Sequence, residues 1–231
     1  MEEFDLRFRV AAARRILHRE ECRSGLFGAV TARIPGGTTV WASTMTYGDE
    51  TRPDDVVEVP LGATVDDLPD GVSPAVAVQL AIYAARPDVG AVVHTHSHYV
   101  SVISTTGRPI GMYNELSTMY HDEQVCVSDD GDRSPAACER TATALGAKRV
   151  LLLKGHGLIA VAPSIEDATI DALALEKAAR WDLAARPYGG EEIVPAHLRQ
   201  TRPLYDLYFR PNMWAANLRR LRRSDPDLFP R

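Results

Sequence analysis

Three histidines in one short segment are spaced so that their imidazoles could bind a metal ion. His94, His96 and His98 follow the β-rich run 89–93 at intervals of two residues. Side chains alternate between the two faces of a strand, so an extended segment would place these imidazoles on one face. Two imidazoles at this spacing can converge on one metal ion, and imidazole nitrogen suits zinc, iron, copper or nickel. Two histidines at this spacing also occur on protein surfaces and in cores without binding a metal. A third histidine nearby in the fold would favour a metal site.

Another histidine, His156, stands between Gly155 and Gly157 after the apolar run 151–153. Glycines on both sides permit unusual backbone angles and close approach of other backbone segments. A buried strand that ends in Gly-His-Gly would put an imidazole at the mouth of a sheet. The alternative is a tight turn with an incidental histidine.

Apolar periodicity and turn residues indicate the helices and strands around these histidines. Ser73-Pro74 and Ser134-Pro135 are typical helix starts, and Pro35-Gly36-Gly37 indicates a hairpin. The sequence predicts helices over 4–20, 75–85, 135–146 and 164–185, and strands over 29–34, 39–42, 56–59, 89–93, 150–153 and 158–161. Strand pairs thus lie between separated helices, which predicts α/β layering around a sheet that is at least partly antiparallel.

The chain length of 231 residues fits one fairly large domain. We expect a single domain over 1–231, in which residues from about 195 to 231 form a helical tail. The tail carries Tyr205, Tyr208 and Trp214 and then the basic run 219–223. The aromatic side chains could close the pocket of a neighbouring subunit, or they could belong to the core or an interface.

Charge and composition limit the classes of partner. A formal net charge of -5 gives no general attraction to nucleic acid or to an anionic membrane. The sequence has no apolar run near the roughly 20 residues that span a bilayer, and its acidic first residues are unlike a signal peptide. Cys22, Cys126 and Cys138 form no paired framework. We therefore expect a cytoplasmic protein with a small-molecule substrate.

Four segments, taken in order, resemble the class II aldolase/adducin family. They are 28–33 (GAVTAR), 80–89 (LAIYAARPDV), 91–97 (AVVHTHS) and 151–158 (LLLKGHGL), within a match from about residue 4 to 185. The resemblance implies a three-layer α/β/α fold around a mostly antiparallel sheet, with metal ligands at His94, His96 and His156. It also implies a divalent metal ion, with Zn²⁺ first and Fe²⁺, Mn²⁺ or Co²⁺ as alternatives. Members are often homotetramers with the site near a subunit interface.

The chain departs from the family's sugar-phosphate aldolases at the proton-transfer and phosphate sites. Those enzymes place an acid/base glutamate 19 residues before the first metal histidine, and that position is Ala75 here. Ala29 replaces a family asparagine, and Ser73-Pro74 replaces a serine pair, although proline has no N–H to donate. We therefore expect an unphosphorylated substrate, with Gly28, Ser73 and His98 as substrate-binding residues.

A third departure supplies a candidate for the missing proton-transfer group. Aldolases of the fuculose-phosphate type have a proton-transferring tyrosine 21 residues after the first metal histidine, and this position is Glu115 here. We predict Glu115 as general base or additional ligand, and Tyr120 and His121 as further catalytic candidates. The alternative for Glu115 is a solvent-facing loop residue.

A three-histidine site leaves coordination positions open for a substrate. The ion can act as a Lewis acid, which predicts a metal-dependent lyase for retro-aldol cleavage, decarboxylation or related chemistry on a small hydroxy-carbonyl or keto-acid substrate. Bound Fe(II) could instead activate dioxygen beside a chelated substrate. The alternative is therefore a non-haem Fe(II) oxygenase of aromatic or keto acids in natural-product biosynthesis. A second alternative is a non-catalytic, adducin-like structural protein, although that class has lost the ligands that this chain keeps.

Overall fold

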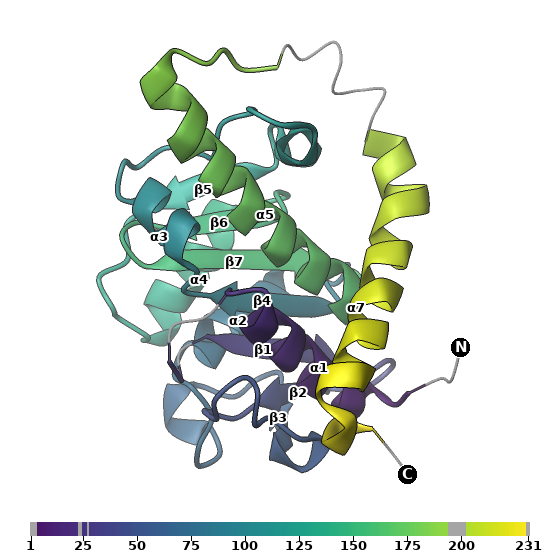
Figure 1. Ribbon diagram of the computed structural model, residues 1–231. Helices are drawn as coiled ribbons and strands as arrows, with labels where there is room; N and C mark the ends of the chain where they lie inside the picture. Colours follow the sequence, from purple (N-terminus) through teal and green to yellow (C-terminus); the bar gives the residue numbers. More distant parts are fainter. Residues whose placement is uncertain (1–3, 23–24, 27, 194–201, 230–231) are drawn as a thin grey trace.

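A computed structural model describes residues 4–22, 25–26, 28–193 and 202–229, which form one seven-stranded sheet and its covering helices (Figure 1). The strand order is β3-β2-β1-β4-β7-β6-β5. Every neighbouring pair is antiparallel except β5 and β6, which are parallel, so the expected mostly antiparallel sheet is confirmed. The strands are β1 (Ala29–Arg33), β2 (Thr39–Ser43), β3 (Val56–Pro60), β4 (Ala91–Thr95), β5 (Gln124–Val127), β6 (Val150–Leu153) and β7 (Gly157–Ala162).

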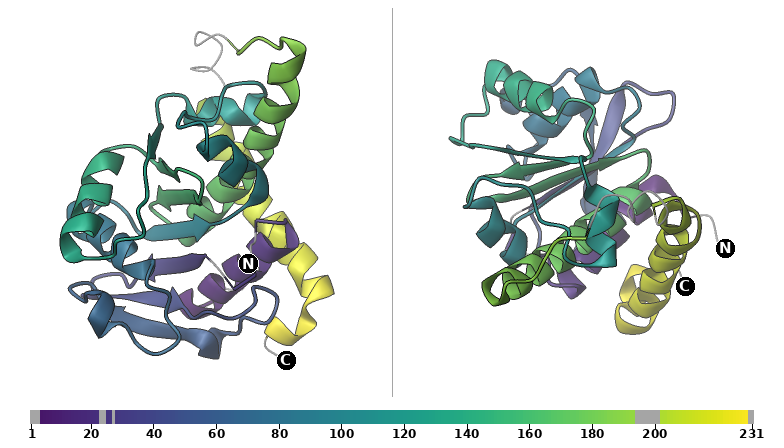
Figure 2. Two further views of the ribbon diagram at one scale, coloured as in Figure 1. Left: turned by 90° about the vertical axis from the view of Figure 1, so that its left-hand side faces the viewer. Right: turned by 90° about the horizontal axis from the view of Figure 1, so that it is seen from above.

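Helices cover both faces of this sheet, which confirms the three-layer α/β/α architecture (Figure 2, right). One face is covered by α2 (Val76–Ala85) and α4 (Pro135–Leu145), and the other by α1 (Leu6–Arg19), α3 (His98–Ser104), α5 (Ile165–Ala185) and α7 (Arg210–Ser224). Short helical turns complete the described chain: η1 (Pro53–Asp55), η2 (Val65–Asp67), η3 (Glu115–Tyr120), η4 (Arg186–Tyr188), η5 (Tyr205–Phe209) and η6 (Pro226–Leu228).

The two apolar cores explain why the central strands read as nearly unbroken hydrophobic runs. β4, β6 and β7 are buried at every position, because helices pack on both of their faces. α4 and α5 begin where the sequence predicts: the side chains of Ser134 and Ser164 accept backbone N–H groups of Ala137 and Asp167 at the starts of these helices. α2 instead begins at Val76, with Ala75 rather than Ser73 as its N-cap residue.

Most of the predicted elements are present, with shifted ends. The strand expected over 89–93 runs instead over Ala91–Thr95, because its hydrogen-bonded register with β7 continues to the pair Thr95 and Leu158. β5 and α3 were not predicted: β5 mixes Gln124 and Cys126 with two valines, and α3 begins at His98, in the segment that was expected to stay extended. The tail contains the expected basic helix, α7, but its predicted start near residue 195 lies outside the described residues. Among the described helices, none combines the length and apolar character needed to cross a membrane.

Candidate metal centre

The three predicted ligands lie at one edge of the sheet. β4, β5 and β6 run in the same direction, because β7 is antiparallel to both β4 and β6 while β5 is parallel to β6. The carboxyl ends of these strands therefore meet. His94 is the next-to-last residue of β4, and His96 directly follows the end of that strand. His156 lies in the turn between β6 and β7.

His94 is the buried ligand, with 2% of its surface exposed. Its Nδ1 lies 2.8 Å from the carbonyl oxygen of Leu158 on the adjacent strand. A carbonyl can only accept, so Nδ1 carries the proton and donates it. The lone pair of Nε2 is consequently free to bind a metal ion, which is the usual arrangement of a metal-binding imidazole.

The chain turns sharply after His96 because α3 begins at once. The backbone N–H groups of Tyr99 and Val100 donate to the two carboxylate oxygens of Glu176 on α5, at 2.9 and 3.0 Å. Glu176 thus satisfies the free N–H groups of this short helix and places negative charge at its amino end. This contact fixes the direction in which the segment leaves the sheet and therefore holds His96 beside His94.

The two glycines around His156 meet different demands. Gly155 has φ +70°, a conformation that side chains disfavour, and a Cβ there would touch nothing within 4 Å. Gly157 lies against the backbone of β4, where an added Cβ would stand 2.1 Å from the carbonyl oxygen of Thr95. The carbonyl of His156 also accepts the hydroxyl of Ser101 on α3, at 2.8 Å. The turn is therefore held to both β4 and α3.

The three imidazoles converge through their Nε2 atoms. His96 Nε2 lies 2.9 Å from Nε2 of His94 and 2.9 Å from Nε2 of His156, and the three ligand atoms all lie within 4.8 Å of one another. Nitrogen ligands at the usual Zn–N distance stand roughly 3 Å apart, so the spacing suits a divalent ion. The Nδ1 contacts of His94 and His156 leave their Nε2 lone pairs directed at one point beside His96, so the donor set fits the implied metal.

Burial keeps these ligands neutral, as metal binding requires. Desolvation, assisted by the neighbouring His96, lowers the pKa of His94 to about 3. Desolvation and the neighbouring His156 lower the pKa of His96 to about 4. Both imidazoles therefore stay unprotonated well below neutral pH.

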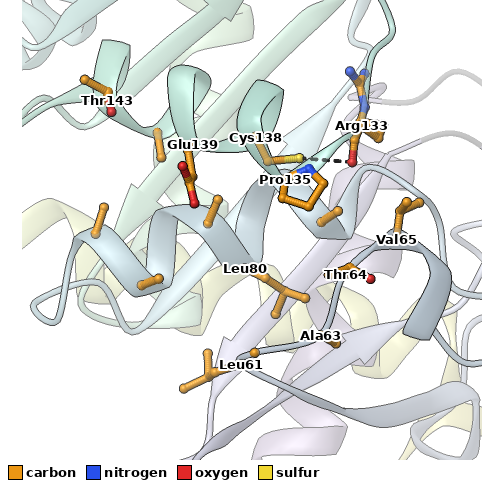
Figure 3. A pocket seen from close by; sticks show the side chains of 16 residues that line it. Leu61, Ala63, Thr64, Val65, Leu80, Arg133, Pro135, Cys138, Glu139 and Thr143 are labelled. Atoms are coloured by element: carbon orange, nitrogen blue, oxygen red, sulfur yellow. Dashed lines mark hydrogen bonds between the residues drawn. The ribbon is translucent and has the colours of Figure 1, made fainter.

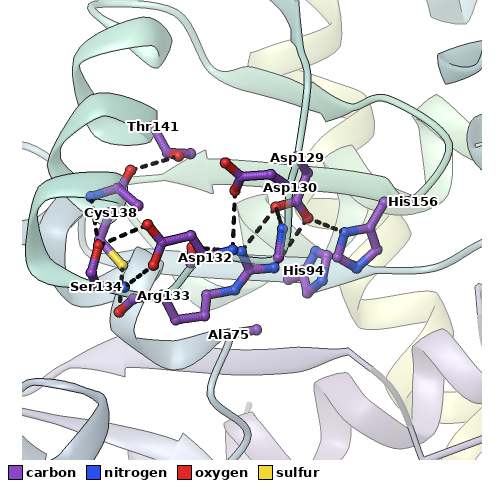
Figure 4. Close-up of polar contacts among 12 residues, drawn as sticks. Ala75, His94, Asp129, Asp130, Asp132, Arg133, Ser134, Cys138, Thr141 and His156 are labelled. Atoms are coloured by element: carbon purple, nitrogen blue, oxygen red, sulfur yellow. Dashed lines mark hydrogen bonds and ion pairs between the residues drawn. The ribbon is translucent and has the colours of Figure 1, made fainter.

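A carboxylate that sequence analysis did not identify orients the third ligand (Figure 4). Asp129, two residues after β5, has Oδ2 2.5 Å from His156 Nδ1. The guanidinium of Arg133 donates to both oxygens of Asp129, at 2.9 and 3.0 Å, and holds the pKa of that carboxyl well below its usual range. Ionised Asp129 therefore accepts from Nδ1–H and leaves Nε2 of His156 free for a metal ion.

The pair of Asp129 and Arg133 could have been suspected only from its place in the sequence. Asp129 is the second residue of the polar run 128–133, which follows an apolar segment, and it stands four residues before Arg133. Its contact with His156 joins residues 27 positions apart and depends on the parallel pairing of β5 with β6. Since β5 itself was not predicted, no sequence pattern placed this loop at the edge of the sheet that carries the three histidines.

Ala75 lies at the start of α2, beside the residues of this centre. Figure 4 shows its methyl group close to the extended Arg133 side chain, which reaches toward His94. Ser73 accepts the backbone N–H of Ala75 at 3.3 Å, so its hydroxyl helps begin the helix. Among the described residues, the potential metal cluster comprises His94, His96 and His156 and no carboxylate.

The predicted catalytic residues beyond the triad lie in and after η3. Glu115 is its exposed first residue. Tyr120 is fully buried, and its hydroxyl donates to Asp171 on α5 at 2.8 Å. His121 is partly exposed and pairs with the neighbouring Asp122 at 3.1 Å. The structure does not bring these side chains into the cluster of three histidines.

The predicted substrate-binding residues also differ in position. His98 does not share a strand face with His94 and His96, because β4 ends at Thr95 and α3 begins at His98, whose side chain is exposed. Gly28, with φ +93°, lies so close to β4 that a Cβ would meet the carbonyl oxygen of His94 at 2.8 Å. Its absent side chain therefore allows β1 to approach the metal edge.

A cavity of about 400 Å³ opens between α2 and α4 (Figure 3). Small and apolar side chains dominate its wall, among them Ala77, Leu80, Pro135 and Cys138. Arg133 belongs both to this lining and to the contacts around the metal centre. The cavity therefore adjoins the centre at Arg133.

The fold and the three converging histidines are arranged as in a class II aldolase, with a candidate metal centre at the sheet edge. The family model for the Class II Aldolase and Adducin N-terminal domain matches residues 8–183. The chain belongs to the class II aldolase/adducin family.

Solved structures support the fold. An aldolase II superfamily protein from Pseudomonas syringae superposes with a TM-score of 0.84, at 24% identity, over 96% of this chain and 94% of that chain. L-fuculose 1-phosphate aldolase from Glaciozyma antarctica PI12 gives a TM-score of 0.81 at 23% identity, over 98% of this chain and 92% of that chain.

Curated relatives in this family include aldolases and enzymes of other activity. The 5-methylthioribulose-1-phosphate/5-deoxyribulose-1-phosphate aldolase of Rhodospirillum rubrum is 32% identical over 50% of this chain, a match that spans 52% of the relative's length. The 4-hydroxy-3-prenylphenylpyruvate oxygenase/4-hydroxy-3-prenylbenzoate synthase of Streptomyces roseochromogenus subsp. oscitans is 29% identical over 84% of this chain and 72% of its own. Decarboxylase NovR of Streptomyces niveus is 28% identical over 84% of this chain and 74% of its own.

Proposed function

We propose that the protein is a metal-dependent lyase that acts on a small, unphosphorylated hydroxy-carbonyl or keto-acid substrate. The observation that carries this proposal is the convergence of three Nε2 atoms, from His94, His96 and His156. The residue before α2, where the family's aldolases have the acid/base glutamate, is Ala75. A divalent ion among the three histidines, with Zn²⁺ proposed first, would polarise a chelated carbonyl and stabilise negative charge as a carbon–carbon bond breaks.

The protein's own residues would prepare the site for this chemistry. The carbonyl of Leu158 and the carboxylate of Asp129 fix the protonated nitrogens of His94 and His156, so both rings present Nε2. Ala29 and Pro74 cannot supply the side-chain and backbone donors of a phosphate cradle, which supports an unphosphorylated substrate.

Proton transfer by Glu115 stays a proposal. Its carboxylate is exposed, so it could reach a substrate held by a neighbouring subunit. The test is the Glu115→Gln variant, for which we expect loss of turnover with unchanged zinc affinity. Unchanged turnover would remove Glu115 from the mechanism. The contacts of Tyr120 and His121 give no support to their predicted catalytic roles.

Assembly into a homotetramer is also a proposal, supported by exposed apolar side chains on η5 and α5. Leu207, Tyr208 and Phe209 are 67, 56 and 59% exposed, and Trp181 on α5 is 55% exposed. Such groups are commonly covered in oligomers. Sedimentation equilibrium of the purified chain tests this, and a monomer at micromolar concentration would refute it.

One specific observation favours a second candidate, a non-haem Fe(II) oxygenase. The match to the Streptomyces roseochromogenus enzyme named for an oxygenase activity spans most of both chains. Elemental analysis after anaerobic purification separates the two functions. Stoichiometric zinc supports the lyase, whereas stoichiometric iron with dioxygen uptake in the presence of a keto acid supports the oxygenase. A metal-free protein that is unaffected by His94→Ala would instead support the adducin-like structural alternative.

A further inference from the structure

Arg133 is a largely buried cation next to the candidate metal centre, and the proposed chemistry leaves it unused. Its side chain is 18% exposed. Figure 4 shows it extended from the start of α4 toward the His94 ring, with Asp129 on one side and Ala75 on the other.

The hydrogen bonds of Arg133 occupy only part of its guanidinium. Nη1 donates to Asp129 Oδ1 at 2.9 Å and to the carbonyl of Asp132 at 3.0 Å, while Nη2 donates to Asp129 Oδ2 at 3.0 Å. A guanidinium carries five N–H donors, so Nε–H and one Nη2–H remain. Neither of these two has an acceptor within the described part of the chain. They lie side by side on one edge of the group, in the spacing that matches a carboxylate.

The anchored end of the guanidinium sets the position of this edge. Oδ2 of Asp129 contacts both His156 Nδ1, at 2.5 Å, and Arg133 Nη2, at 3.0 Å. One carboxylate oxygen therefore joins the metal ligand to the cation. The Arg133 guanidinium cannot lie farther from the His156 ring than these two contacts allow.

The charges around the centre favour an anionic substrate. The three histidines are neutral as ligands, and the charge of Asp129 is balanced by Arg133. The family glutamate that would offset a divalent ion is replaced by Ala75, so an ion bound here would leave net positive charge. A substrate carboxylate would offset that charge in a partly desolvated site, where electrostatic interactions are strong.

We propose that Arg133 is a substrate-binding residue, whose Nε and Nη2 edge binds the carboxylate of a 2-keto or 2-hydroxy acid. This inference rests on the proposed function, because it assumes a substrate held at the three histidines. It narrows the substrate from a hydroxy-carbonyl compound in general to one with a carboxylate. Asp129 would then have two roles, because the same carboxylate orients both His156 and Arg133.

The test measures ligand binding to the zinc-loaded full chain by titration calorimetry. The probes are pyruvate, its neutral analogue hydroxyacetone, and dihydroxyacetone phosphate. Wild type is expected to bind pyruvate more tightly than either other probe. Arg133→Gln is expected to weaken pyruvate binding roughly ten- to hundredfold, the usual range for lost bonds to a charged group, and to leave hydroxyacetone binding within about twofold.

Two further variants separate recognition from structure. Arg133→Lys keeps the charge and a contact with Asp129 but lacks the paired donors, so its pyruvate affinity should fall between wild type and Arg133→Gln. The matched control is Arg140→Gln, which removes an equal charge from an exposed position on α4 and should bind all probes like wild type. Zinc affinity of each variant, measured by chelator competition, reports whether the centre itself is intact.

The outcomes distinguish this inference from the proposed function. Wild type that binds no zinc would refute the proposed function and the inference with it. Zinc-loaded wild type that does not prefer pyruvate, or Arg133→Gln that weakens pyruvate and hydroxyacetone equally, would refute the role of Arg133 alone. An Arg133-dependent preference for dihydroxyacetone phosphate would overturn the carboxylate and favour a phosphate substrate.

Discussion

Replacing Asp129 by asparagine tests how the third ligand is held. The substitution keeps the size of the side chain and one oxygen that can accept from His156 Nδ1. It removes the negative charge that pairs with Arg133 at 2.9 and 3.0 Å, and it replaces the short contact of 2.5 Å to His156 by a neutral hydrogen bond. The amide can also present its NH₂ group to the imidazole, which would favour the wrong tautomer for metal binding.

The expected loss has two parts. A hydrogen-bonded partner of a metal ligand typically contributes 10- to 100-fold to affinity, so zinc binding should weaken by about 1.4–2.7 kcal/mol. The zinc-free protein loses an ion pair whose side chains are 18% and 9% exposed. Leaving Arg133 without its counter-charge should cost about 2 kcal/mol of folding free energy, which lowers Tm by about 4–8 °C in a chain of this size.

The assay is competition for zinc against a chromophoric chelator at pH 7, together with thermal unfolding of the zinc-free protein. Asp130→Asn is the matched control. This adjacent carboxylate is exposed and accepts the backbone N–H of Asp132. The control should match wild type in zinc affinity. If Asp129→Asn binds zinc as tightly as wild type, Asp129 does not orient His156 and the reasoning is wrong.

Three further predictions concern the groups that position the ligands. Gly157→Ala should lower the free energy of unfolding by more than about 3 kcal/mol, because its Cβ would stand 2.1 Å from the carbonyl oxygen of Thr95. Gly155→Ala should lower it by about 1 kcal/mol, because only the positive φ of that residue is unfavourable for alanine. Urea unfolding of the two variants compares these losses. Glu176→Gln should weaken the start of α3 by about 1–2 kcal/mol, measured in the same way, and an unchanged midpoint would contradict its role. For the zinc-free protein, the free energy of unfolding should be measured at pH 7 and at pH 4. Its decrease over this range should be about 3 kcal/mol larger in wild type than in the His94→Asn variant.

The sign of that pH effect follows from which state binds protons. An unfolded histidine titrates near its ordinary pKa of 6.5, whereas His94 in the folded chain has a pKa of about 3. Between these values the unfolded state takes up a proton that the folded state excludes, so stability falls as pH falls. Burial raises the pKa of Asp171 to about 6, which acts in the opposite direction but is common to both proteins. Equal pH profiles of wild type and His94→Asn would contradict the burial of a neutral imidazole.

The convergence of the three histidines could be predicted from sequence because each of them has a strong local signal. His94 and His96 follow a β-rich run at the spacing of a strand, and His156 lies in Gly-His-Gly after an apolar run. The resemblance to a known family joined the two segments, which no local pattern could do. The layered fold was also predictable from local patterns, because β4, β6 and β7 are short apolar runs bounded by turn residues.

The supporting groups could not be predicted because their contacts depend on tertiary structure. Glu176 reaches the start of α3 across 76 and 77 positions, and Asp129 reaches His156 across 27. The prediction for His98 was wrong about its strand face because it assumed that the extended segment continued. The chain instead turns into α3 after His96, where a carboxylate from α5 receives the free N–H groups.

The most direct test of the central claim is the metal content of the purified chain. The full-length protein is isolated anaerobically, analysed for zinc, iron, manganese and cobalt, then stripped with chelator and titrated with zinc. A site of three imidazoles predicts about one divalent ion per chain in wild type, and a loss of high-affinity binding in a folded His94→Asn variant. A folded wild type that neither carries nor takes up an ion would contradict the assignment of His94, His96 and His156 as metal ligands.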